Sequence, residues 1–138
     1  MYIGRFYATI FCEVERLYRI IFYQKSNGES PVLDYIHELE ASTSKDSRIK
    51  RNQIAVHIKV LAEKGTIAGM PYMRHLDGEI WELRPIRDRI LFAGVLGDAF
   101  VLLHSFIKKT QKTPKQEIEQ AKRELQDFID RGNEDERS

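Results

Sequence analysis

Residues 84–108 of this chain include side chains that can bind an anion or move a proton, among them Arg84, Arg89, His104 and Lys108. Arginine and lysine bind phosphate and neutralise the charge that grows on it in a transition state. Histidine can exchange a proton near neutral pH. If these side chains meet, they suit a phosphodiester, and single-stranded RNA brings its own nucleophile, the 2′-OH. An aromatic ring, Phe106 or Tyr72, could stack on a base.

Two other kinds of site are not indicated by the sequence. His, Cys and Asp are not grouped at the spacing of metal ligands. The glycines Gly65, Gly69 and Gly78 do not form the phosphate-binding loop G-x-x-x-x-G-K. We therefore expect neither a metal nor another cofactor.

Each candidate residue also has a structural interpretation. A histidine in an apolar strand, such as His104, is more often a hydrogen-bonded structural residue than a functional one. The lysines at 108–109 suit the solvated end of a strand. Arg84 could simply pair with Glu82, and Arg87 with Asp88, which contributes little at a surface.

The hydrophobic pattern predicts an α+β domain. The expected elements are a strand at 19–24, a helix that begins after Ser30, a helix at about 45–64 that Gly65 ends, strands at 80–85, 88–97 and 99–109, and a helix that Thr113 caps and Gly132 ends. The last three strands follow one another too closely for crossover helices, so we expect an antiparallel meander.

Side chains alternate between the two faces of a strand. Trp81 and Leu83 should share one face, which indicates that Trp81 belongs to the core, while Arg84 lies on the other face. Arg89 should share a face with Leu91 and Ala93.

On the last strand, alternation places His104, Phe106 and Lys108 on the same face as Phe100 and Leu102. If helices cover one side of the sheet, Arg84, Arg89, His104 and Lys108 could gather on the other. The strand register decides this, and it cannot be read from the sequence.

Composition indicates one ordinary globular domain, with 138 residues, 42% hydrophobic and 31% charged. The single cysteine, Cys12, favours a reducing compartment, and we expect a cytoplasmic protein without a membrane anchor. The net charge of +1 hides an uneven distribution, because residues 45–115 carry fourteen Lys/Arg and seven Asp/Glu, whereas residues 116–138 carry four and eight. A basic centre suits a polyanionic partner.

Two stretches, HLDGEIWELRPIRDRILF and FVLLHSFIKKTQKTPKQEIEQAKREL, resemble toxins of type II toxin–antitoxin pairs. They are similar to the HigB-like, phage-derived branch of the RelE/ParE superfamily, over about residues 19–131. The resemblance implies a small twisted antiparallel sheet, formed by the N-terminal strand and the meander, with two helices packed on it and a C-terminal helix. It divides the chain into an N-terminal extension (1–18), a toxin domain (19–132) and a polar tail (133–138).

The resemblance also implies a ribosome-dependent messenger-RNA endonuclease that needs no metal. Arg84 and Arg89 would contact the scissile phosphate, with His104 and Lys108 as the other catalytic residues. The residues expected to bind RNA are Lys50, Lys59, Arg74, Arg87, Phe106, Lys109 and Lys112. A HigA-like antitoxin with a helix-turn-helix domain would bind and silence the toxin, and operator DNA would be bound only through that complex.

Two alternatives remain open at this level. Some relatives poison DNA gyrase and do not cut RNA, on a related fold. The chain could also be a generic α+β domain or a binding module. The Arg/His/Lys set favours the nuclease, because a gyrase poison needs no proton-transfer group.

Overall fold

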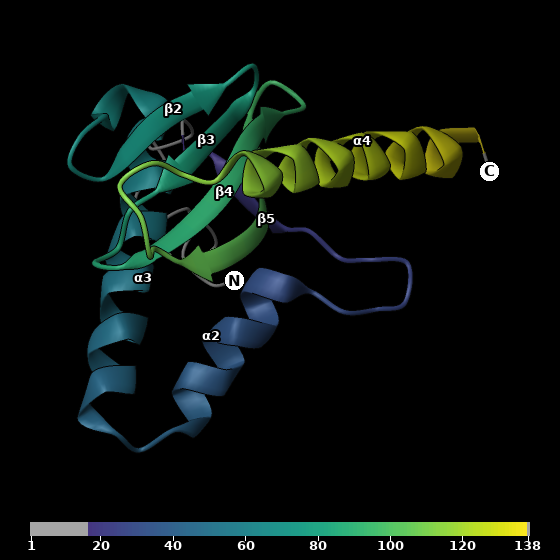
Figure 1. Ribbon diagram of the computed structural model, residues 1–138. Helices are drawn as coiled ribbons and strands as arrows, with labels where there is room; N and C mark the ends of the chain where they lie inside the picture. Colours follow the sequence, from purple (N-terminus) through teal and green to yellow (C-terminus); the bar gives the residue numbers. More distant parts are fainter. Residues whose placement is uncertain (1–16, 138) are drawn as a thin grey trace.

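The computed structural model describes residues 17–137, so the predicted N-terminal extension lies almost entirely outside the described part of the chain. A central sheet separates two helices, α2 and α3, from a third helix, α4, as Figure 1 shows. The elements are β1 (Arg19–Phe22), α2 (Pro31–Ala41), α3 (Lys45–Lys64), a 3-10 turn η1 (Gly65–Ala68), β2 (Met73–Asp77), β3 (Ile80–Leu83), β4 (Asp88–Val95), β5 (Ala99–Ile107) and α4 (Lys115–Arg137). The predicted α+β class is confirmed.

Within residues 17–137 the sheet has five strands, in the order β1-β5-β4-β3-β2. Strands β2 to β5 form the antiparallel meander, and β2 was not foreseen as a strand. Strand β1 pairs with β5 in parallel, so the sheet is mixed and the prediction of a purely antiparallel sheet is wrong. The long path through α2 and α3 carries the chain back across the sheet, as a parallel pairing requires.

One face of the sheet packs against α2 and α3. The helix predicted after Ser30 is confirmed as α2, and its residues Val32, Ile36 and Leu39, at helical spacing, are buried together with residues of α3. Helix α3 ends where predicted, at Gly65, whose φ of 65° favours glycine. A Cβ on this glycine would also lie only 2.8 Å from the Tyr18 ring.

The opposite face packs against α4. Ala121 and Leu125 of this helix contact a second buried cluster that includes Leu91 and Leu103. The predicted end of the helix at Gly132 is wrong, because α4 continues to Arg137. Gly132 is not among the glycines with positive φ, so it does not form the left-handed turn that ends a helix.

A β-bulge in β5 decides which face the functional side chains occupy. Leu91 of β4 pairs with His104, whereas the next residue, Phe92, pairs with Leu102, so Leu103 is an extra residue. Leu102 therefore packs toward α2 and α3, but Leu103 and His104 both face α4. The expectation that His104 and Phe106 share a face with Leu102 is wrong, because alternation restarts at the bulge.

Candidate active site

A buried carboxylate gathers three arginines on the α4 face of the sheet. Glu82 of β3 is fully buried, and its Oε2 lies 2.6 Å from Arg84 Nη1, 3.1 Å from Arg74 Nη2 and 4.0 Å from Arg89 Nε. Its Oε1 accepts a hydrogen bond of 2.6 Å from the Thr113 hydroxyl. Three guanidinium groups thus share one carboxylate, and the cluster retains a net positive charge that suits an anion.

Arg89 is the most enclosed of these arginines, with 5% of its surface exposed. Its Nη1 donates hydrogen bonds to the carbonyl oxygens of Ile86 and Asp88, which fix the direction of the guanidinium. Burial lowers the pKa of Arg89, and the positive charges of Arg84 and Arg74 lower it further. An arginine stays protonated despite such a shift, so a positive charge is held in a partly desolvated position.

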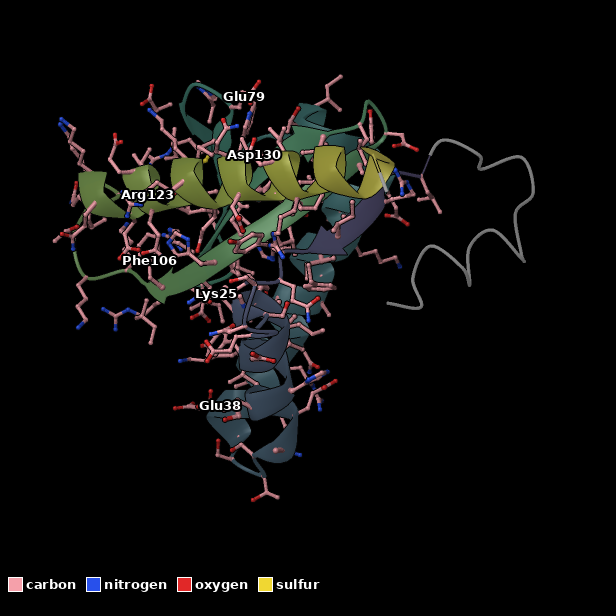
Figure 2. The ribbon with its side chains drawn as sticks, turned by 90° about the vertical axis from the view of Figure 1, so that its right-hand side faces the viewer. Lys25, Glu38, Glu79, Phe106, Arg123 and Asp130 are labelled. Carbon is pink, nitrogen blue, oxygen red and sulfur yellow. The ribbon has the colours of Figure 1, made fainter. Side chains whose placement is uncertain are left out.

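Arg89 lines a groove of about 680 Å³ that lies between the end of β5, the start of α2 and the start of α4. Arg74, Phe106, Lys108 and Lys109 line the same groove. Figure 2 shows Phe106 near the end of β5, beneath the first half of α4. The groove thus combines four cations with an aromatic ring, which are the features that bind a single-stranded polyanion.

Lys108 is held in place by its backbone, whose N–H donates to the Arg87 carbonyl at 2.7 Å. The segment from Lys108 to Gln111 lines a second, smaller groove of about 390 Å³ as well. Arg87 lies in this smaller groove, and Arg89 lines both. A chain of phosphates could therefore contact Arg89 from either side of the Lys108–Gln111 segment.

His104 does not line either groove. It is 4% exposed and lies between two carboxylates of α4, with Nδ1 2.6 Å from Glu124 Oε1 and Nε2 2.9 Å from Glu117 Oε1. Burial lowers the pKa of His104, but the hydrogen bonds and charges of Glu124 and Glu117 outweigh burial, so that the pKa is raised. The imidazole therefore has the hydrogen-bonded structural environment that the sequence left open as an alternative.

The sequence-predicted residues do not all meet. Arg84 belongs to the Glu82 cluster but does not line the larger groove, and its predicted pairing with Glu82 is confirmed. Lys50 and Lys59 lie on α3, on the other side of the sheet from α4. Lys112 is exposed in the segment between β5 and α4, outside both grooves.

Several polar residues of this region were missed or misread from the sequence. Thr113 was expected to cap α4, but its hydroxyl instead donates to Glu82. Tyr35 of α2 was not among the candidate residues, yet its hydroxyl donates to the buried Asp88 carboxylate at 2.9 Å. Glu117 gave no signal, because a glutamate in the first turn of a helix is common for electrostatic reasons alone.

The part of the chain from residue 17 to residue 137 contains no helix that is long and apolar enough to cross a membrane. Within the same residues, no three His, Cys, Asp or Glu side chains are grouped as metal ligands would be.

Comparison with known proteins gives one family match. Residues 34–126, about two thirds of the chain, match the family described as "Phage derived protein Gp49-like (DUF891)". No curated protein matches the sequence at the significance required. The matched range begins within α2, includes every element from α3 to β5, and ends in the middle of α4. It therefore contains the Glu82 cluster and all the residues that line the larger groove except Pro31.

Proposed function

We propose a function from the premise that this chain belongs to the phage-derived Gp49-like family, which is in general a family of RelE/HigB-type toxins. The chain acts as the toxin of a toxin–antitoxin pair and cleaves messenger RNA on the ribosome. The observation that carries this proposal is the position of Arg89. Its guanidinium is partly desolvated, is directed by fixed backbone contacts, and faces a groove that also holds Arg74 and two lysines.

The groove supports a reaction in which RNA supplies the nucleophile. Arg89 and Arg74 bind the scissile phosphate and neutralise the charge that grows on it. The 2′-oxygen attacks phosphorus, the bond to the 5′-oxygen breaks, and a 2′,3′-cyclic phosphate and a 5′-hydroxyl form. Lys108 donates the proton that the 5′-oxygen needs, while Lys109 binds the backbone and Phe106 stacks on a base.

Two of the predicted residues need a different place in this proposal. Arg84 does not contact RNA in this proposal. Its ion pair with Glu82 fixes the carboxylate that in turn positions Arg74 and Arg89. His104, predicted as a proton-transfer group, lies beneath α4, and Glu117 lies between its Nε2 and the larger groove. Lys50 and Lys59, which lie across the sheet from the groove, would contact RNA other than the scissile segment.

A toxin of this kind works with a partner that silences it. In our proposal that partner is a HigA-like antitoxin with a helix-turn-helix domain, and operator DNA is bound only by the complex of the two proteins.

Primer extension on a defined message in a purified translation system tests the proposed function. We expect cuts that need ribosomes, and an Arg89→Lys variant that cuts about 100-fold more slowly or worse, since lysine cannot reproduce the directed guanidinium contacts. Arg123→Ala, which removes a cation from an exposed position of α4, is the matched control and should cut like the wild type.

Other results would redirect the proposal. Cuts on RNA without ribosomes would keep the chemistry but remove the ribosome from it. An intact message with undisturbed translation would contradict the nuclease. A supercoiling assay would then test the gyrase-poison alternative.

A further inference from the structure

Among the described residues, two carboxylates line the larger groove, and they differ in what they can do. Asp88 is 2% exposed, and its Oδ1 accepts the Tyr35 hydroxyl, so it is enclosed and hydrogen-bonded. The Glu117 side chain is 22% exposed, so its carboxylate remains open to a molecule in the groove. Glu117 is therefore the carboxylate that could take part in a proton transfer there.

Behind Glu117 lies a chain of buried polar groups. Both ring nitrogens of His104 face carboxylate oxygens, Glu117 Oε1 at 2.9 Å and Glu124 Oε1 at 2.6 Å. A neutral imidazole carries one N–H only, and its other nitrogen would then face a carboxylate with a lone pair. The two contacts thus suit an imidazolium, which can donate from both ring nitrogens. The second oxygen of Glu124 accepts from Gln120 Nε2 at 3.1 Å, which fixes the far end of the chain.

The strand register places this chain of groups next to Arg89. Arg89 of β4 pairs with Phe106 of β5, and two residues further along β4, Leu91 pairs with His104. Arg89 and His104 therefore lie close together on the α4 face. Glu117 of α4 contacts the His104 ring there, at Nε2. A carboxylate and a guanidinium thus line one groove, which is the arrangement that a proton acceptor and a phosphate-binding group need.

We propose that Glu117 is a catalytic residue that accepts the proton of the attacking 2′-OH, and that His104 and Glu124 are positioning residues that hold its carboxylate at the groove. This inference rests on the proposed function. The O2′–H bond breaks and its proton goes to Glu117, while the bond from O2′ to phosphorus forms. The bond from phosphorus to O5′ breaks, and O5′ takes a proton from the Lys108 ammonium group. Exchange with water returns both side chains to their starting states.

The test is a Glu117→Gln variant, which keeps the shape of the side chain but cannot accept the proton. We expect kcat for ribosome-bound message to fall at least about 100-fold, the range for loss of a general base. The KM should stay the same or decrease, because a negative charge is removed from a groove that binds a polyanion. A merely structural role would not separate kcat from KM in this way.

Glu119→Gln is the matched control, since it removes the same charge from an exposed position of the same helix. It should leave both constants near those of the wild type. The positioning variant Glu124→Gln should lower kcat less than Glu117→Gln does, since its side chain never touches RNA in our proposal.

The outcomes separate this inference from the function on which it rests. If the wild type cuts and Glu117→Gln cuts equally fast, the inference is overturned and the nuclease stands. If the variant loses binding of ribosome-bound message together with cleavage, Glu117 has a structural role and the inference is overturned as well. If the wild type itself leaves the message intact, the proposed function fails and the inference fails with it.

Discussion

Replacing Glu82 by glutamine tests whether one buried carboxylate organises the arginine cluster. Glutamine has nearly the same volume, so no cavity is created, but it lacks the negative charge. One carboxylate oxygen now accepts from Thr113 and the other from Arg84. In glutamine, an NH2 group would replace one of these oxygens and face a donor. Three guanidinium groups would then lie around a neutral side chain.

The expected loss of stability depends on how well each of these ion pairs is shielded from water. The Arg74 side chain is 42% exposed, so its ion pair contributes little. The side chains of Arg84 and Arg89 are 16% and 6% exposed, and that of Glu82 is completely buried. Removing one partner of a buried ion pair costs about 3–5 kcal/mol. For a domain of this length, we expect the melting temperature to fall by roughly 10–15 °C.

Urea unfolding of the wild type and the variant measures this change. The dependence of the unfolding free energy on urea concentration should be the same for both proteins. Glu79→Gln is the matched control, because Glu79 is exposed in the turn before the same strand, and its effect should stay within about 0.5 kcal/mol. A loss below about 1 kcal/mol for Glu82→Gln would refute the reasoning, since the arginines would then be held by other contacts.

Two further predictions concern groups beside the groove. Tyr35→Phe should reduce stability by about 1–3 kcal/mol in urea unfolding, because the buried Asp88 carboxylate loses a hydrogen-bond donor; an unchanged midpoint would contradict this. Because the pKa of His104 is raised in the folded protein by Glu124 and Glu117 despite burial, its contribution is complete below its ordinary pKa of 6.5 and is lost as pH rises through the folded value. The stability difference between the wild type and His104→Gln should therefore shrink above pH 6.5, and a difference that grows with pH would refute it.

The sequence predicted the helices well because their signals are local. Val32, Ile36 and Leu39 repeat at helical spacing, and Gly65 ends α3 with a backbone conformation that glycine adopts at little cost. Gly132 looks the same in the sequence, but it continues the helix. A glycine permits a stop without enforcing one, and the surrounding contacts decide.

The sheet was predicted less well because its pairing depends on distant residues. β2, with the sequence MRHLD, has little β-branched or aromatic content, and its pairing with β3 stabilises it. The parallel pairing of β1 with β5 joins residues about eighty positions apart, and no local pattern encodes it. Likewise, the residues that complete the arginine cluster come from β2, β3, β4 and the segment before α4.

The position of His104 depends on a single extra residue. Strict alternation along β5 would have directed His104 toward α2 and α3, on the same face as Leu102 and away from Arg89. The bulge at Leu103 turns His104 to the α4 face instead. Glu117 and Glu124, seven residues and thus about two helical turns apart, lie on the same side of α4 and both contact it there. The cost of a disrupted ladder at the bulge is thus offset by two charge-assisted hydrogen bonds that fix α4 on the sheet. The same contacts hold the Glu117 carboxylate at the groove, so the irregularity in β5 connects the fold to the proposed chemistry.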